Sequence, residues 1–154
     1  MIEEEILHRI NSVLHAPLPT DEDILLDTSK NYNLAVKTTE FLHSNIDKGV
    51  TLEELSRKLS TNRNTLSEAF KEHKGMTIFS WFREQRLLKA ASLLASTSLS
   101  VTRISEEVGF YNSNNFSSAF KKRFNISPLQ YRKHKLRPLH SQLSSTFSEQ
   151  QSQT

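Results

Sequence analysis

The sequence contains no cysteine, and it has only three glycines and four prolines among 154 residues. Without cysteine the chain can form neither disulfides nor thiolate metal sites, which fits a reducing compartment such as the cytoplasm. So little turn material argues against a many-stranded sheet and favours an all-α fold. No apolar run is long enough to cross a membrane, and the acidic start 1–5 is unlike the basic start of a secretory signal. We therefore expect a helical, cytoplasmic protein with no membrane role.

Motifs of catalytic chemistry are also missing. No nucleophile motif and no phosphate-binding loop can be recognised, and the acidic pairs at 53–54 and 106–107 are typical of helix caps and solvated faces. The six histidines follow no metal-ligand spacing: His8, His15, His43, His73, His134 and His140. We therefore expect no enzyme activity, no metal and no cofactor.

Charge is distributed unevenly along the chain. Residues 1–50 carry 4 Lys/Arg against 9 Asp/Glu, whereas residues 51–137 carry 16 against 7, a net charge of +9. A basic block of this kind is consistent with contact to a polyanion such as nucleic acid. Taken alone the signal is weak, because many solvated surfaces are basic.

The N-terminal part is interpreted as an acidic extension. Residues 2–15 have helical apolar spacing, and Pro17 and Pro19 end that segment. Residues 20–32 are rich in Asp, Thr, Ser and Asn, which suggests a linker or a marginal helical turn. A core-facing helix is expected from about 33 to 45, closed at Gly49. The tail 137–154 is rich in Ser and Gln and is expected to be disordered.

Residues 51–75 have the pattern of a helix-turn-helix unit. Thr51 is a plausible N-cap with Glu54 at the capping-box position, and leucines 52, 55 and 59 form one apolar face. A polar turn at 60–62 leads to a second helix that ends at Gly75. A long helix over 77–95 follows, and it is apolar on most of its circumference, so it should be buried between neighbours.

The helix-turn-helix pattern then returns at residues 101–124. Leu55-Ser56-x-x-Leu59 matches Ile104-Ser105-x-x-Val108 at an offset of 49 residues. Leu66-Ser67-x-Ala69-Phe70-Lys71 matches Phe116-Ser117-x-Ala119-Phe120-Lys121 at an offset of 50, and Gly75 matches Asn125. The only slip falls in a turn, where an insertion is tolerated. The chain thus contains two copies of one unit.

The connecting helix gives this repeat a geometric meaning. About 19 residues at about 1.5 Å each span roughly 28 Å. Major grooves on one face of B-DNA recur every ~34 Å, so the two second helices could enter successive grooves.

The second unit also carries a long signature. It reads Ile104-x-x-x-Val108-Gly109-Phe110-x-x-x-x-x-Phe116-x-x-x-Phe120-Lys121-Lys122-x-Phe124-x-x-Ser127-Pro128-x-x-Tyr131-Arg132. This signature closely resembles that of the AraC/XylS family of bacterial transcription regulators. The run Arg86-Leu87-x-x-Ala90-x-x-Leu93-Leu94 resembles the linker helix of that family. The resemblance covers about residues 33–134.

The resemblance implies an AraC-type DNA-binding domain over residues 33–136, with about seven helices, which acts on promoters as an activator and contacts RNA polymerase. Only about 32 residues precede it, so we expect either a single-domain member or the DNA-binding half of a longer regulator. Four positions depart from the family pattern. Ser56 and Ser105 replace alanine, and a buried serine can bond to the carbonyl four residues earlier. Asn125 replaces glycine, and Glu68 stands where a basic residue is common.

Candidate contact residues are chosen as the helix face opposite the apolar positions. The expected base contacts are Asn64, Ser67 and Glu68 in the first unit and Ser113, Asn114, Ser117 and Ser118 in the second. The expected phosphate contacts are Arg63, Lys71, Lys121, Lys122 and Arg123. Serine discriminates bases poorly, so water and DNA shape are expected to supply part of the specificity.

Plainer interpretations remain open for several of these residues. Asn62 and Asn112 could be turn or cap residues, and the basic cluster 121–123 could be a solvated helix end stabilised by the helix dipole. Arg86 and Arg132 could contact phosphate or could tie helices together.

A different function is also open. The chain could be a protein-interaction module that modulates a larger regulator or RNA polymerase, with vestigial DNA binding. Glu68 and the serine-rich second recognition helix favour that alternative, whereas the basic excess over 51–137 opposes it. Self-association through the N-terminal helix is possible as well.

Overall fold

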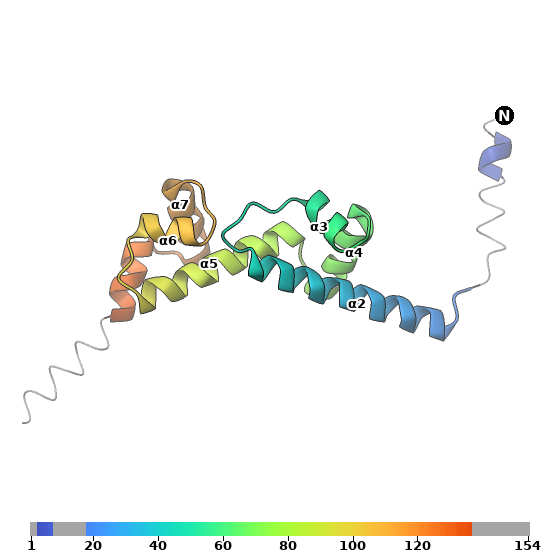
Figure 1. The fold of residues 1–154 in the computed structure, drawn as a ribbon, viewed down its shortest axis with the longest axis horizontal. Coiled ribbons are helices and arrows are strands. Elements are labelled where there is room, and N and C mark those ends of the chain that lie inside the picture. The colour runs from blue at the N-terminus through green and yellow to red at the C-terminus, as the bar shows by residue number, and fades with distance from the viewer. Residues whose placement is uncertain (1–2, 8–17, 137–154) are drawn as a thin grey trace, which may run out of the picture.

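The regular structure of this chain is helical throughout the part that the computed structural model describes, residues 3–7 and 18–136. The main helices are α2 (Asp21–Ser44), α3 (Leu52–Lys58), α4 (Arg63–Lys74), α5 (Ile78–Ser96), α6 (Val101–Glu107) and α7 (Ser113–Phe124). Residues 3–7 and 128–136 are helical as well. The expected fold class is confirmed: two helix-turn-helix units, α3–α4 and α6–α7, are joined by the long helix α5 (Figure 1). Within these ranges no helix is long and apolar enough to span a membrane.

Local capping rules set most helix ends. Each helix from α2 to α7 begins after a Ser, Thr or Asn whose side chain accepts a hydrogen bond from the first turn: Thr20, Thr51, Asn62, Thr77, Ser100 and Asn112. Asn62 and Asn112 are therefore helix caps, in agreement with the plainer interpretation given above. Helices α4 and α7 end on left-handed residues, Gly75 at φ 71° and Asn125 at φ 65°.

Helix α2 begins earlier than expected. Residues 21–32 are not a linker or a marginal turn but the first half of one 24-residue helix. Thr20 and Asp23 form a reciprocal capping box, and three acidic residues in the first turn complement the helix dipole. The helix ends at Ser44, close to the expected end at about 45, and its cap is Asn45 rather than Gly49. The Asp and Thr residues that suggested a turn are helix-start residues.

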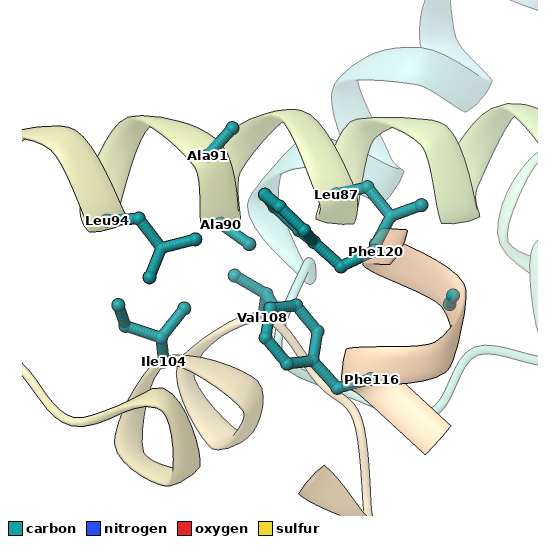
Figure 2. Close-up of a cluster of buried hydrophobic side chains, with 9 residues drawn as sticks. Leu87, Ala90, Ala91, Leu94, Ile104, Val108, Phe116 and Phe120 are labelled. Atoms are coloured by element: carbon teal, nitrogen blue, oxygen red, sulfur yellow. The ribbon is translucent and has the colours of Figure 1, made fainter. Parts of the chain in front are cut away.

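The two units have separate hydrophobic cores that share α5. The first core combines α2, α3 and α4 with the N-terminal part of α5, including Leu42, Phe70 and Phe82. The second core combines the C-terminal part of α5 with α6 and α7. Figure 2 shows Leu87, Ala90 and Leu94 pointing from α5 toward the side chains of α6 and α7. Because each half of α5 buries a different face, the helix is apolar around most of its circumference.

The serines at the family's alanine positions are accommodated inside these cores. Ser56 and Ser105 are buried, and their hydroxyls donate to the carbonyl oxygens of Glu53 (3.0 Å) and Thr102 (2.7 Å). The acceptor lies three residues earlier rather than the four expected. Satisfying the hydroxyl within its own turn removes most of the cost of burying it.

Candidate nucleic-acid interface

Helices α4 and α7 present equivalent polar faces to solvent. Each buries an apolar triplet, Leu66, Ala69 and Phe70 in α4 and Phe116, Ala119 and Phe120 in α7. Because the buried residues occupy equivalent positions in the two helices, the exposed residues on the opposite sides occupy equivalent positions as well. The predicted base contacts Asn64, Ser67 and Glu68 of α4 therefore share one face with Lys71, and Asn114, Ser117 and Ser118 of α7 share one face with Lys121 and Lys122. Ser113 lies seven residues before the buried Phe120, and so on the side of the apolar triplet.

On α4 the side chains of Arg63, Asn64, Glu68 and Lys71 are exposed. Ser67 is half-buried, and its hydroxyl donates to the carbonyl oxygen of Arg63 at 2.8 Å. That hydrogen bond occupies the proton of Ser67, so the hydroxyl can offer a base only its acceptor lone pairs.

On α7 the side chains of Asn114, Ser118, Lys121 and Lys122 are exposed, whereas Ser113 and Ser117 are half-buried. Neither lysine has an ion pair within the described residues. Both therefore remain available to a phosphate, although a solvated helix end is also consistent with this placement.

The two exposed faces match at three positions. Counting 50 residues onward from α4, Asn64, Ser67 and Lys71 are followed by Asn114, Ser117 and Lys121. The difference between the faces is their charge. Glu68 and Glu72 on α4 are replaced by Ser118 and Lys122 on α7, so only the first face carries carboxylates that repel phosphate.

Within the described residues Arg123 forms an ion pair with α5, unlike the two lysines before it. Its Nε donates to both carboxylate oxygens of Glu84 on α5, at 2.7 and 2.9 Å, and its Nη2 lies 2.7 Å from Oε1. This hydrogen bond to Glu84 is the main cause that raises the pKa of Arg123. Arg123 therefore ties α7 to α5, and its contact to phosphate stays a prediction.

Arg86 and Arg132 each bridge two backbone carbonyl groups. Arg86 donates from Nε to Ile46 (2.8 Å) and from Nη2 to Lys48 (2.6 Å). Arg132 donates to the carbonyl oxygens of Leu94 (3.1 Å) and Leu99 (2.5 Å). Arg86 thus holds the segment before α3 against α5, which follows the first unit. Arg132 holds the segment before α6 against the helix 128–136, which follows the second unit. Of the two roles left open above, tying helices together is the one seen here.

A basic groove beside α7 was missed by the sequence reasoning. It has a volume of about 490 Å³ and lies between α5 and the second unit, with Arg83, Asn115, Ser118 and Lys122 among its lining residues and no carboxylate. Arg83 is exposed and makes no ion pair within the described ranges. No motif marks Arg83, because only the packing of α5 against α7 brings it to the recognition helix.

Comparison with known proteins extends these observations. A family model described as a helix-turn-helix domain matches residues 55–134. The xylose operon regulatory protein of Escherichia coli K12 is 32% identical over 97 residues, which are 63% of this chain and 25% of that protein. This chain therefore spans about a quarter of the length of that relative.

Solved structures share the fold. An AraC-type transcriptional regulator from Chromobacterium violaceum has a TM-score of 0.66 and 25% identity, covering 71% of this chain and 98% of that one. The DNA-binding domain of AdpA, solved in complex with a target DNA, has a TM-score of 0.64 at 21% identity and covers 68% of this chain and 94% of its own. The second similarity concerns the fold alone.

Proposed function

The chain belongs to the AraC/XylS family of helix-turn-helix transcription regulators, which are not enzymes, and from that premise we propose that it reads two successive major grooves with α4 and α7. The observation that carries this proposal is the pair of equivalent exposed faces on units joined by one 19-residue helix. At about 1.5 Å per residue, α5 is roughly 28 Å long, close to the ~34 Å repeat of major grooves on one side of B-DNA.

Within this proposal Asn64 and Asn114 are the principal base-reading residues. Both are exposed and occupy the same position in their helices, and an asparagine amide can pair bidentately with adenine. The hydroxyls of Ser67, Ser113, Ser117 and Ser118 add less discriminating contacts, and Glu68 can accept a hydrogen bond from cytosine N4.

Phosphate contacts are assigned to cations near the recognition helices that form no ion pair within residues 3–7 and 18–136. We assign this role to Arg63, Lys71, Lys121 and Lys122, and we add Arg83, whose groove adjoins Lys122. The two units then contribute unequally to affinity. The α7 face carries two lysines and no carboxylate, whereas Glu68 and Glu72 offset Lys71 on α4. Most of the electrostatic affinity is therefore expected from the second unit.

Activation of transcription is the regulatory effect that we propose, with RNA polymerase as the protein partner. Relatives named as activators support this choice, among them RhaR of Mannheimia succiniciproducens. We also propose self-association through the N-terminal helix that the sequence predicts at residues 2–15. Residues 3–7 are the described part of it, and Ile6 and Leu7 are exposed there.

A titration by fluorescence anisotropy tests the DNA proposal. The protein is titrated with its own upstream promoter duplex and with a scrambled duplex at two salt concentrations. We expect tighter binding to the promoter and a steep loss of affinity with salt, because phosphate contacts release counterions. The double variant Lys121→Glu with Lys122→Glu should abolish binding.

The matched control is Lys37→Glu with Lys89→Glu, which makes the same charge change at exposed positions of α2 and α5. This control should keep most of the affinity, because neither lysine lies on a recognition helix. Failure of the folded wild-type protein to bind either duplex at low salt would refute the proposal. The search would then turn to a docking partner for the same fold.

A further inference from the structure

The chain segment that leads into the first helix-turn-helix unit contacts the second unit directly beside α5. The segment 46–49, which leads from α2 to α3, lies against the turn 109–111 between α6 and α7. Arg86, near the middle of α5, lies at the same junction. The separation of the two recognition helices is therefore held by a side contact as well as by the connecting helix.

Arg86 anchors the first unit at this junction. Its guanidinium donates to the carbonyl oxygens of Ile46 and Lys48 and packs 4.1 Å from the centre of the Phe82 ring. Burial lowers the pKa of Arg86, and the nearby Tyr111 and Asp47 oppose that shift. An arginine remains protonated in such surroundings, so both hydrogen bonds are charge-assisted.

The lack of a side chain at Gly109 lets the turn of the second unit lie against Ile46 and Arg86. Its φ is +79°, and a Cβ built there would lie 2.7 Å from the carbonyl oxygen of Ile46 and 2.8 Å from Nη2 of Arg86. The matching turn of the first unit has Ser60 in the left-handed region, at φ 52°. The backbone angle alone does not demand glycine at this point of the turn, so the demand comes from the close approach of the first unit.

A second contact lies next to the first. A Cβ added at Gly49 would be 3.0 Å from the hydroxyl oxygen of Tyr111. Two glycines, one in each unit, thus lie where the segment 46–49 meets the turn 109–111. Sliding or rotation of the second unit along α5 would drive these backbones into each other or pull Arg86 away from its carbonyl partners.

We propose that Arg86 and Gly109 act as positioning residues that fix the separation of α4 and α7 and so make the protein selective for the number of base pairs between its two half-sites. This inference rests on the proposed reading of two grooves. Adding one base pair rotates one half-site about the DNA axis by roughly 35°, because B-DNA has about 10–10.5 base pairs per turn. A pair of units locked at one separation can follow that change only if the DNA twists or bends.

The variant Arg86→Lys tests the inference, and Arg132→Lys is its matched control. Lysine keeps the charge but cannot donate in a planar fork to two carbonyls. Arg132 makes the same kind of fork, but its acceptors are at the end of α5 and at Leu99, where it does not touch the first unit. Both variants should lose similar thermal stability, and only Arg86→Lys should release the junction.

The first readout needs no DNA. The chain has no cysteine, so spin labels can be attached at Glu72→Cys on α4 and Ser118→Cys on α7 alone. We expect one narrow distance distribution for the wild-type background and for Arg132→Lys, and a broader one for Arg86→Lys. Should Arg86→Lys fail to fold, Gly109→Ala replaces it, because its added methyl group pushes the two units apart.

The second readout is affinity for duplexes whose half-sites are moved by −1, 0 or +1 base pair. The wild type and Arg132→Lys should lose about tenfold on either shift, comparable to the loss from one wrong base pair. Arg86→Lys should lose less than about threefold, because its units can adjust to the shifted sites. A spacing profile and distance distribution for Arg86→Lys identical to those of the wild type would overturn the inference. Wild-type protein that binds no duplex would instead refute the proposed function, while the label distances would still test the junction.

Discussion

A comparison of the variants Gly109→Ala and Gly75→Ala distinguishes two contributions to the loss of stability, namely backbone strain and contact between the two units. Both glycines are in the left-handed region, at φ 79° and 71°. A Cβ at Gly75 would meet no atom within 4 Å, whereas a Cβ at Gly109 would overlap Ile46 and Arg86. The two substitutions therefore share one cost, and only Gly109→Ala carries a second.

The shared cost is the left-handed conformation of a residue with a Cβ, about 1–2 kcal/mol. At Gly109 the added carbon would also lie 2.7 Å from a carbonyl oxygen, whereas an ordinary carbon–oxygen contact is about 3.3–3.6 Å. The neighbouring backbone must therefore move by several tenths of an ångström, and overpacking of that kind costs about 1–3 kcal/mol. We expect a loss of about 1–2 kcal/mol for Gly75→Ala and about 2–5 kcal/mol for Gly109→Ala.

Urea unfolding followed by circular dichroism measures both losses. The wild type and both variants should share one m-value if each unfolds in a single transition. In thermal unfolding the extra cost at Gly109 corresponds to at least about 3–4 °C for a domain of this size. Equal losses at the two glycines would refute the reasoning, because they would mean that the first unit exerts no steric demand on the second.

Further substitutions test the contact residues and the free cations. Asn114→Ala and Asn64→Ala should each weaken promoter binding by about 1–3 kcal/mol and relax preference at one base pair, which competition with single-base variants of the duplex would show. Glu68→Gln should strengthen promoter binding a few-fold by removing a charge that repels phosphate. An affinity that is unchanged or lower in the anisotropy titration would contradict that reasoning. Lys122→Gln should reduce the slope of log affinity against log salt by about 1. Arg123→Gln should leave that slope unchanged and lower the thermal stability only slightly, because its pair with Glu84 is partly exposed to solvent.

Much of the architecture could be predicted from the sequence because it depends on local rules. The repeated apolar spacing identified the buried faces of α4 and α7, and the cap residues determined where those helices begin. Gly75 and Asn125 each follow a recognition helix directly, and both residue types tolerate the left-handed conformation that is observed there. Each of these signals involves residues within one or two helical turns of one another. Helix α2 is the exception, since its capping box at Thr20 and Asp23 was local information interpreted as a turn.

Only the tertiary structure decided which charged residues form ion pairs or hydrogen bonds with distant parts of the chain. Arg123 and Glu84 are 39 residues apart, and Arg86 is 40 residues from Ile46. Periodicity shows which face of a helix is exposed, but it does not show which side chain of another helix lies opposite. Arg123 and Lys122 are therefore equivalent in the sequence, although Arg123 forms an ion pair and Lys122 forms none with any residue that the structure describes. The requirement for glycine at 109 likewise arises only when the backbone of the first unit is brought beside the turn of the second.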